Sequence, residues 1–253
     1  MPFDYLWRGA PRRTWLWPPC QCVGAQQDQA QQEQRLKQTA EAEKRTEYDL
    51  QLQRAGLTGL LRDWTFDTYQ DRPKFPDAAN VRSRVRLFAQ SIESVSPQQH
   101  LKPWLILYGD YGLGKSHLAA AVIRQLVDRN YTGCYFRAWT SYLKRLQASW
   151  DRKAREEKGE SETQILAELT RGRVVVIDDL DKVNATEWTR SSLYLVLNKR
   201  YTDNAPTILT FNHALGDRAL LDYVGEAVMD RIMQHAFDLI EFRGESFRIQ
   251  SED

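Results

Sequence analysis

The chain has 253 residues, 42% of them hydrophobic, which is enough for one sizeable domain with an extension or for two small domains. Its 35 basic side chains nearly cancel 34 acidic ones, so the net charge excludes a globally basic nucleic-acid binder. Three cysteines (Cys20, Cys22 and Cys134) are too few for a disulfide framework, and no apolar run reaches the ~18 residues of a membrane span. We therefore expect a cytoplasmic protein with no membrane partner.

The composition changes twice along the chain. Residues 1–25 combine aromatic side chains with arginine and proline, and residues 26–54 consist mostly of Gln, Glu, Lys, Arg and Ala. Such a polar stretch predicts a solvated helix, or a segment that stays disordered until it meets a partner. We assign residues 1–59 to an N-terminal partner-binding extension, Gln-rich from residue 26, and residues 60–253 to one folded domain.

Short apolar runs alternate with helical patterns in the folded zone. Strands are expected at residues 104–108, 134–136, 173–177, 207–211 and 238–242. Helical spacing is found at residues 116–129, from residue 141 onward and at residues 187–201. Strands that are apolar on both faces and alternate with helices predict an α/β fold, in which helices cover both sides of a parallel sheet.

The segment Gly109–Ser116 reads G-D-Y-G-L-G-K-S and matches the phosphate-binding loop G-x-x-x-x-G-K-[ST] at every fixed position. Its glycines let the backbone curl so that successive N–H groups face phosphates, and the dipole of the following helix favours the same negative charge. Lys115 is expected to reach the β- and γ-phosphates of ATP, and Ser116 to bind Mg²⁺. The residues assigned to nucleotide binding here are Gly109, Asp110, Tyr111, Gly112, Leu113, Gly114, Lys115, Ser116 and His117.

Polar side chains follow two of the expected strands. Asp178 and Asp179 come after the run 174–177, and we assign Asp178 to Mg²⁺ and Asp179 to orienting and polarising the attacking water. Asn212 follows the run 207–211. Because ligand groups gather at the carboxyl ends of parallel strands, Asn212 is expected beside the γ-phosphate, where it could position water. A solubilising acidic turn and a turn-forming asparagine are the structural alternatives.

Five separated segments, in the same order, resemble the AAA+ ATPases of the DnaC/IstB type. They are GDYGLGKSHL at 109–118, IDDLDK at 177–182, TEW at 186–188, PTILTFN at 206–212, and a tail with VMDRI and GESFR. The resemblance covers residues 60–250. It implies a five-stranded parallel AAA+ sheet flanked by helices, without the separate helical lid of larger relatives.

The resemblance also implies roles for two arginines that the residues alone would leave as surface charges. Arg231 matches the arginine finger that reaches the nucleotide of a neighbouring subunit, with Arg218 as a weaker candidate, so self-association on ATP binding is expected. Arg248 matches the sensor arginine that contacts the nucleotide near the end of the chain. The residues assigned to catalysis are thus Asp179, Asn212, Arg231 and Lys115.

The sequence departs from the family pattern at two places. Asp179 stands where many AAA+ enzymes carry glutamate, and its shorter side chain predicts slow hydrolysis that a partner or DNA stimulates. Relatives often carry an N-terminal zinc-type cysteine cluster, of which Cys20 and Cys22 remain. A zinc site needs four ligands, so metal binding by this pair is left open.

Residues 139–158 mix aromatic and basic side chains, a combination that binds single-stranded DNA through base stacking worth ~1–3 kcal/mol per base. The aromatic members are Trp139, Tyr142 and Trp150, and the basic members are Lys144, Arg145, Arg152, Lys153, Arg155 and Lys158. The alternative is an amphipathic helix with a solvated charged face. The acidic residues that favour this alternative are Asp151, Glu156, Glu157 and Glu160.

Aromatic residues with arginine nearby, as in residues 3–17, are typical of interface hot spots. The aromatic residues are Phe3, Tyr5, Trp7, Trp15 and Trp17. In helicase loaders of the family, the N-terminal extension grips the replicative helicase. A partner site is therefore expected here, with packing onto the ATPase domain as the alternative.

These features together lead to an ATP-dependent loader that binds ATP and Mg²⁺ and delivers a replicative DNA helicase to single-stranded DNA. A transposition-associated ATPase that binds DNA and a transposase is the alternative. A nucleotide-gated adaptor with negligible turnover is a third interpretation, of another class.

Overall fold

The computed structural model describes residues 23–70, 75, 77–94, 102–150 and 161–247. Contacts divide the chain into two units, residues 1–48 and residues 49–253. The first unit is described from Val23 onward as the greater part of α1 (Val23–Ala55), a helix of 33 residues. Residues 30–47 of this helix are exposed, as its polar sequence requires. Of the two alternatives for the Gln-rich stretch, the structure therefore adopts the helix.

The second unit begins within the last turns of α1. Leu52, Ala55 and Leu57 are buried in it, each at most 3% exposed. The helix ends at Gly56, whose φ of +87° allows its N–H to bond the Gln53 carbonyl at 2.9 Å, as in other glycine-terminated helices. The compact unit thus starts before the boundary expected at residue 60, because residues 49–59 carry apolar side chains that it buries.

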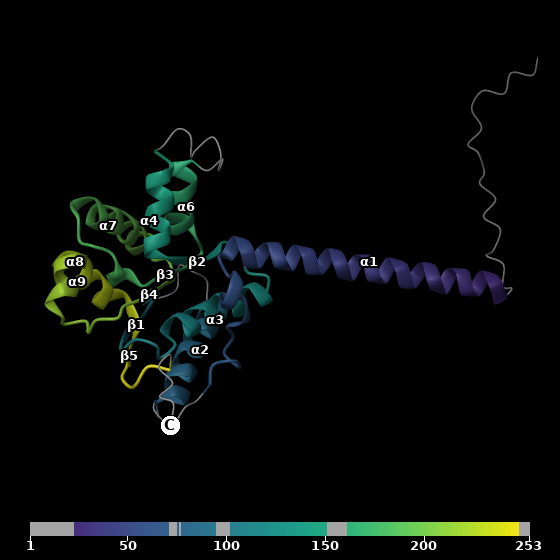
Figure 1. Cartoon of the computed structure of the whole chain (residues 1–253), viewed down its shortest axis with the longest axis horizontal. Helices are drawn as coiled ribbons and strands as arrows, with labels where there is room; N and C mark the ends of the chain where they lie inside the picture. The colour runs from purple at the N-terminus through teal and green to yellow at the C-terminus, as the bar shows by residue number, and fades with distance from the viewer. Residues whose placement is uncertain (1–22, 71–74, 76, 95–101, 151–160, 248–253) are drawn as a thin grey trace, which may run out of the picture. The chain divides into compact units, whose positions relative to one another are not determined.

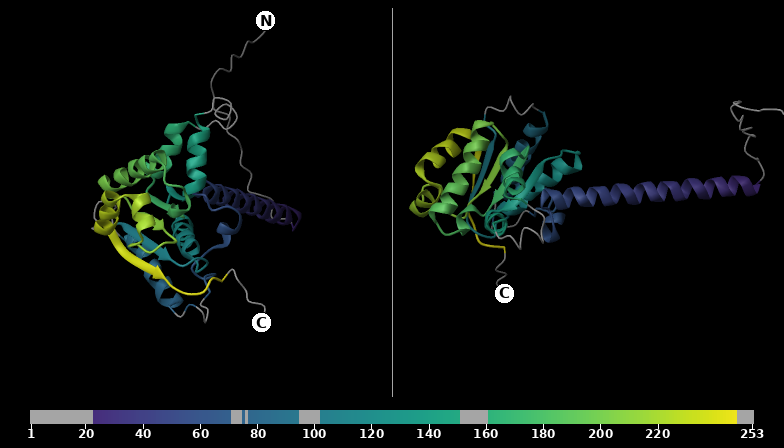
Figure 2. Two further views of the ribbon diagram at one scale, coloured as in Figure 1. Left: turned by 60° about the vertical axis from the view of Figure 1, so that its left-hand side comes forward. Right: turned by 90° about the horizontal axis from the view of Figure 1, so that it is seen from above.

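The second unit is built on a five-stranded sheet whose strands are all parallel. The strands are β1 (Trp104–Gly109), β2 (Cys134–Ala138), β3 (Val174–Asp178), β4 (Thr207–Thr210) and β5 (Ala236–Phe242). Their order in the sheet is β2-β3-β4-β1-β5. All five expected strands are confirmed, with ends that differ by one or two residues. In the left view of Figure 2, β5 (yellow) lies at one edge of the sheet.

Helices cover both faces of this sheet (Figure 1). One layer holds α2 (Ala78–Ser94) and α3 (Lys115–Asp128). The other layer holds α4 (Trp139–Ala148), α6 (Glu162–Arg171), α7 (Glu187–Thr202), α8 (Arg218–Val224) and α9 (Glu226–His235). Single 3₁₀ turns lie at Gly59–Asp63 (η1) and Leu180–Lys182 (η3). Among the described residues, no helix is both long and apolar enough to cross a membrane.

Alternate strand residues separate the two layers. The helices α4, α6, α7, α8 and α9 pack against one set of strand side chains in a single apolar cluster. These side chains are Trp104 and Ile106 of β1, Val175 and Ile177 of β3, and Leu209 of β4. The intervening residues face the other layer, because successive side chains of a strand point to opposite faces. Strands apolar on both faces are the reason that a parallel sheet could be predicted from the sequence.

A buried arginine ties the amino-terminal edge of the sheet to two helices. Arg200 of α7 is 0% exposed. Its Nε donates to Thr207 Oγ1 at 2.7 Å, and its Nη1 donates to the carbonyls of Leu169 and Gly172 at 2.8 and 3.0 Å. Its Nη2 donates to the Pro206 carbonyl at 2.5 Å. One guanidinium of α7 thereby satisfies four acceptors, which belong to α6, to the residue that follows α6, to the residue that precedes β4 and to β4 itself.

Replacing Arg200 with lysine is expected to lower the free energy of unfolding by about 2 kcal/mol. Lysine keeps the charge, but its single ammonium cannot reach acceptors spread around a planar fork, and a buried acceptor left unpaired costs about 1–3 kcal/mol. Urea unfolding measures the change. Arg190→Lys, at an exposed position of α7, is the matched control and should change the stability by less than about 0.5 kcal/mol. Equal stabilities of the two variants would contradict this assignment.

Candidate functional site

The strand register brings three predicted segments to one edge of the sheet. Gly109 of β1 is paired with Phe242 of β5, and Leu107 of β1 with Thr210 of β4. Because β4 also pairs with β3, the loop after β1, the acids at the end of β3 and the residues after β4 leave the sheet at the same edge. The strand order on which the Asn212 prediction depends is therefore confirmed.

The loop 109–114 has the backbone that a phosphate cradle needs. Gly109, Gly112 and Gly114 have φ values of +110°, +74° and +89°, which a residue with a Cβ rarely adopts. The Asp110 N–H does not face the cradle, because it donates to the Phe242 carbonyl at 2.8 Å and so continues the sheet. Leu113 is fully buried, so its backbone alone can face a ligand.

Lys115, the first residue of α3, is held by the loop that precedes it. Its Nζ donates to the carbonyls of Gly109 at 2.8 Å and Asp110 at 2.6 Å. Burial lowers the pKa of Lys115 to about 8, against the opposing charges of Asp179 and three other acids. The ammonium therefore lies over the loop in the absence of a ligand. Because it is shielded from water, its electrostatic attraction to a phosphate is stronger than it would be at the surface.

Asp178 is a buried carboxylate at the end of β3, 6% exposed. Thr210 Oγ1 donates to its Oδ1 at 2.7 Å, and the Ser116 hydroxyl also bonds this carboxyl group. Burial, reinforced by the charge of Asp179, raises the pKa of Asp178 to about 6, although these hydrogen bonds oppose the shift. A hydroxyl and a carboxylate are both oxygen ligands, so the pair Ser116 and Asp178 fits Mg²⁺.

Magnesium binding with ATP is expected to weaken as the pH falls below about 6, because a proton then competes with the metal for Asp178. The raised pKa means that the metal-free folded protein holds a proton on Asp178 more tightly than the unfolded chain does. Protonation of Asp178 therefore adds to the free energy of unfolding. This contribution is fully present below about pH 4 and is lost as the pH rises through about 6.

Magnesium titrations at several pH values, followed by the fluorescence of a labelled nucleotide, measure this dependence. The variant Asp178→Asn should bind magnesium weakly at every pH. Equal magnesium affinities of the unaltered protein at about pH 5 and pH 7.5 would contradict the assignment.

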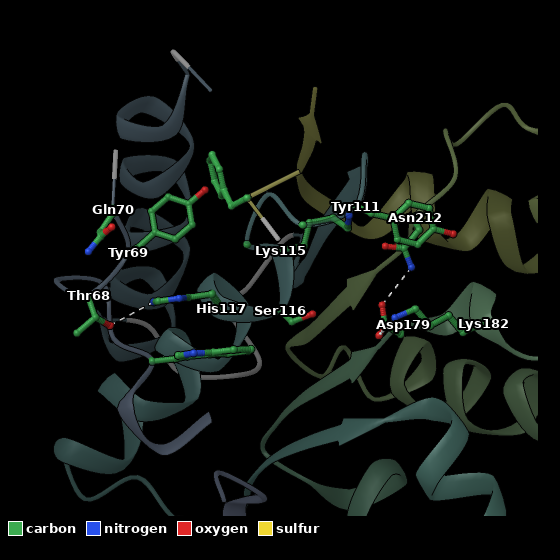
Figure 3. A pocket seen from close by; sticks show the side chains of 14 residues that line it. Thr68, Tyr69, Gln70, Tyr111, Lys115, Ser116, His117, Asp179, Lys182 and Asn212 are labelled. Atoms are coloured by element: carbon green, nitrogen blue, oxygen red, sulfur yellow. Dashed lines mark hydrogen bonds and ion pairs between the residues drawn. The ribbon is translucent and has the colours of Figure 1, made fainter. Parts of the chain in front are cut away.

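Asp179 follows Asp178 with a positive φ of 54°, which turns its side chain out of the strand direction. Its N–H donates to Thr210 Oγ1 at 2.8 Å. Its Oδ2 accepts a hydrogen bond from Lys182 at 2.5 Å, and its Oδ1 accepts one from Asn212 Nδ2 at 3.1 Å. Figure 3 shows this Asn212–Asp179 contact at one end of the cleft.

A cleft of about 300 Å³ runs along the loop and joins these groups. Its lining includes Lys115, Ser116, Asp179 and Asn212 toward one end (Figure 3). Toward the other end lie Thr68, Tyr69 and Gln70, which precede the sheet. Trp64 also lines the cleft. The volume lies at the lower limit of small-molecule sites.

The aromatic end of the cleft is organised around His117. The Trp64 ring stacks on the His117 ring with centroids 5.2 Å apart and planes 5° apart, and the Tyr69 ring meets it edge-on at 5.3 Å. His117 Nε2 lies 2.9 Å from the Thr65 carbonyl, and burial lowers the pKa of the ring. The Tyr69 hydroxyl donates to the Leu113 carbonyl at 2.9 Å. His117 was predicted from the loop motif, whereas residues 64–70 carry no motif that points to a site.

Residues 244–247, which follow β5, cross over the phosphate loop. The Gly244 N–H donates to Asp110 Oδ2 at 3.0 Å, and the Phe247 N–H donates to the Gly112 carbonyl at 3.3 Å. A Cβ on Gly112 would lie 2.0 Å from Ser246 Oγ, so glycine is needed there for this close approach as well as for its φ. Phe247 also lines the cleft. In this tail the sequence predicts a nucleotide contact for Arg248, whereas the structure shows the contacts of Gly244 and Phe247 with the loop.

The predicted arginines lie away from the cleft or beyond the described residues. The Arg231 guanidinium of α9 lies over the rings of Tyr194 and Tyr201 of α7, at 5.1 and 5.4 Å from their centroids. Arg218 is exposed at the start of α8. Arg248 falls outside the residues that the structure describes.

The expectation that Trp139 and Tyr142 stack on DNA bases is wrong. Both are 0% exposed, and the Trp139 indole donates to the Tyr223 hydroxyl at 2.5 Å inside the core. Of the predicted aromatic group, Trp150 remains available at 55% exposure, edge-on to Trp188 at 5.6 Å. Arg145 is paired with Glu168 of α6 at 2.9 Å rather than free for a phosphate.

Several predicted surfaces fall outside the described residues. They are the aromatic N-terminal segment, Cys20 and Cys22, and the basic residues Arg152, Lys153, Arg155 and Lys158. Of the three cysteines, Cys134 is described, and it is a buried thiol in β2 whose pKa is raised by burial.

The phosphate loop follows β1, and β4 lies in the sheet between β1 and the acid-bearing strand β3. The crystal structure of the DnaC helicase loader superposes with a TM-score of 0.58 and 23% sequence identity, over 74% of this chain and all of that one. At this identity the likeness establishes the fold, a five-stranded parallel AAA+ sheet flanked by helices.

The chain belongs to the family of IstB-like ATP-binding proteins, whose model matches residues 86–253. An ATP-binding protein of insertion sequence IS21 from Pseudomonas aeruginosa is 30% identical over 151 residues, 58% of this chain and 53% of that protein. The replicative helicase loader DnaC of Escherichia coli K12 is 23% identical over 195 residues, 77% of this chain and 73% of that protein. The chain thus spans about half the length of its insertion-sequence relative.

Proposed function

We propose that this protein is an ATP-dependent helicase loader, which acts in the cytoplasm and delivers a replicative DNA helicase to single-stranded DNA. The observation that supports this choice is the extent of the DnaC match, which reaches 77% of the chain against 58% for the IS21 protein. The shared fold and the complete phosphate loop support ATP as the ligand. The fold and the loop are common to both candidate functions, so the identity of the partner protein distinguishes a loader from a transposition ATPase.

The described residues support a division of labour during ATP hydrolysis. The loop amides from Tyr111 onward and the Lys115 ammonium bind and orient the phosphates. Ser116 and Asp178 hold Mg²⁺, which when bound supplies positive charge that neutralises the phosphate oxygens. Asp179 accepts a proton from the attacking water, and Asn212 holds that water in place. Since Lys182 pairs with Asp179, the base is restrained, which favours slow turnover until a partner or DNA releases it.

Self-association through Arg231 is part of this proposal. Its Nη1 is buried without a hydrogen-bond partner among the described residues, although a buried guanidinium donor ordinarily has one. To reach a phosphate oxygen of the ATP bound by a neighbouring subunit, the guanidinium would leave the rings of Tyr194 and Tyr201 and gain the acceptor that it lacks here. Mixing Arg231→Ala with a Lys115→Ala variant tests this role. Two inactive variants should restore partial ATPase activity if one subunit supplies the arginine and another the loop.

A transposition-associated ATPase is the second candidate. The family match and the 30% identity to the IS21 protein favour it, and that identity exceeds the 23% to DnaC. In this role the chain would bind DNA and a transposase instead of a helicase. The nearly balanced charge of the chain favours neither candidate over the other.

Two measurements test the proposal. ATPase rates are compared without DNA, with single-stranded DNA and with duplex DNA, and pulldowns use the full chain with the replicative helicase or the transposase of the same organism. Stimulation by single strands and capture of the helicase support the loader. Stimulation by duplex and capture of the transposase support the alternative. If the protein captures a partner only in the presence of ATP and shows no measurable ATP hydrolysis, the result supports a nucleotide-gated adaptor.

A further inference from the structure

Asp181 is a buried carboxylate beside the cleft that the loop and acid motifs do not assign. It lies in η3, two residues after Asp179, and its side chain is 4% exposed. Its Oδ2 accepts from the backbone N–H groups of Asn212 at 2.5 Å and His213 at 2.9 Å. The same oxygen lies 2.7 Å from His213 Nδ1, and Oδ1 accepts from Asn212 Nδ2 at 3.0 Å. One carboxylate therefore holds the chain where it leaves β4.

The Asn212 carboxamide has one orientation that this arrangement allows. Its Nδ2 donates to Asp179 Oδ1 at 3.1 Å and to Asp181 Oδ1 at 3.0 Å. Both partners are carboxylates, which only accept hydrogen bonds when ionised. Turning the carboxamide over would place its carbonyl oxygen against two negative groups. The amide nitrogen is therefore fixed on the side of the acids, as Figure 3 shows for Asp179.

The Asn212 carbonyl oxygen is thereby left for the cleft. Asn212 is among the residues that line the cleft, and its Oδ1 has no hydrogen-bond partner within the described part of the chain. A carbonyl oxygen accepts hydrogen bonds and is repelled by an anionic phosphate, whereas water can donate to it. The free group of Asn212 thus suits a water molecule better than a phosphate oxygen.

We propose that Asp181 is a positioning residue that turns the Asn212 carboxamide so that its carbonyl oxygen, rather than its amino group, faces the nucleotide and accepts a hydrogen bond from the attacking water. This inference rests on the proposed ATPase function. Asp181 acts through Asn212 and touches neither nucleotide nor water. Two of its four contacts are to Asn212, one to the backbone N–H and one to the side-chain amide, and the other two are to His213.

The isosteric variant Asp181→Asn tests the proposal with little change in shape. An amide at position 181 can donate to the Asn212 oxygen and so permits the reversed orientation. We expect kcat to fall about 10- to 100-fold, while the affinity for ATP changes less than about threefold, because no hydrogen bond of Asp181 involves the loop or Lys115. Asp203→Asn, which removes the exposed carboxylate partner of Lys199, is the matched control and should leave both quantities unchanged.

A double-mutant comparison separates positioning from general structural support. In an Asn212→Ala background, Asp181→Asn should lower kcat by less than about twofold, because the group that it positions is gone. A purely structural role would lower kcat by the same factor in both backgrounds and would reduce the melting temperature as well. Equal factors, or an unchanged kcat in the single variant, would overturn the proposal.

The orientation can also be measured without any turnover. In the ¹⁵N spectrum of the unaltered protein, the Asn212 side-chain amide protons should exchange slowly, since both are bonded to carboxylates. In Asp181→Asn they should exchange faster and shift. If the unaltered protein hydrolyses no ATP, the proposed function fails, yet this spectrum still decides whether Asp181 orients Asn212. Identical amide signals in the two proteins would rule the orientation out.

Discussion

Replacing Asp179 with alanine should lower the single-turnover rate of ATP hydrolysis about 10²- to 10⁴-fold, the usual contribution of a positioned general base. ATP binding should change little, since none of the hydrogen bonds of Asp179 involves the loop. Its carboxylate bonds Asn212 and Lys182, which both lie outside the loop. Rapid mixing with excess enzyme gives the rate, and fluorescent nucleotide titration gives the affinity.

The glutamate variant examines the effect of side-chain length. Asp179→Glu adds one methylene, which brings the carboxylate closer to the γ-phosphate and should raise the hydrolysis rate if short reach limits it. Asp222→Ala, which removes an exposed acid of α8, serves as the control and should match the unaltered protein. Unchanged rates in both the alanine and the glutamate variants would exclude Asp179 as the base.

Replacing Lys115 with alanine should weaken ATP binding about 30- to 4,000-fold in magnesium buffer. Truncating one partner of a desolvated charge pair costs about 2–5 kcal/mol, and each 1.4 kcal/mol is a factor of ten in affinity. Lys115 is 5% exposed, so water cannot replace its ammonium at the phosphates. Isothermal titration calorimetry with a slowly hydrolysed ATP analogue measures the loss.

The same variant gives a pH signature. The pKa of Lys115 is about 8 in the free protein, so the ammonium is lost as the pH rises through 8, and ATP affinity should fall above that pH. The alanine variant should lack this decline. Lys199→Ala, at an exposed lysine paired with Asp203, is the control. ATP affinity that is undiminished in Lys115→Ala would exclude the loop as the nucleotide site.

The local part of the fold could be predicted from the sequence because its signals are local. Each strand is a short apolar run, and the loop 109–116 needs particular residues at consecutive positions. Asp178 and Asn212 could be placed because both end apolar runs, and parallel strands bring their ends to one edge. The helix α6 was missed, although Ser161 and Gln164 form a capping box that marks its start.

The rest of the site depends on contacts between distant segments. Trp139 and Tyr142 have the composition of a DNA-binding face, and only the position of α4 against the sheet shows that they are core residues. Trp64 lies at the cleft because its ring stacks on the ring of His117, which comes 53 positions later in the sequence (117 − 64). Asp181 has no assigned role in the sequence motifs, and its contacts depend on the end of β4, which lies beside it only in the fold.

The crossing of residues 244–247 over the phosphate loop has a practical consequence. Gly244 and Asp110 are 134 positions apart, yet a hydrogen bond joins them directly, and Phe247 of the same stretch lines the cleft. We therefore expect nucleotide binding to depend on the conformation of residues 244–247. A purification tag or a fluorescent dye attached just beyond Phe247 would disturb occupancy, or report it, as strongly as one attached to the loop itself. Kinetic assays on tagged protein should be repeated after the tag is removed.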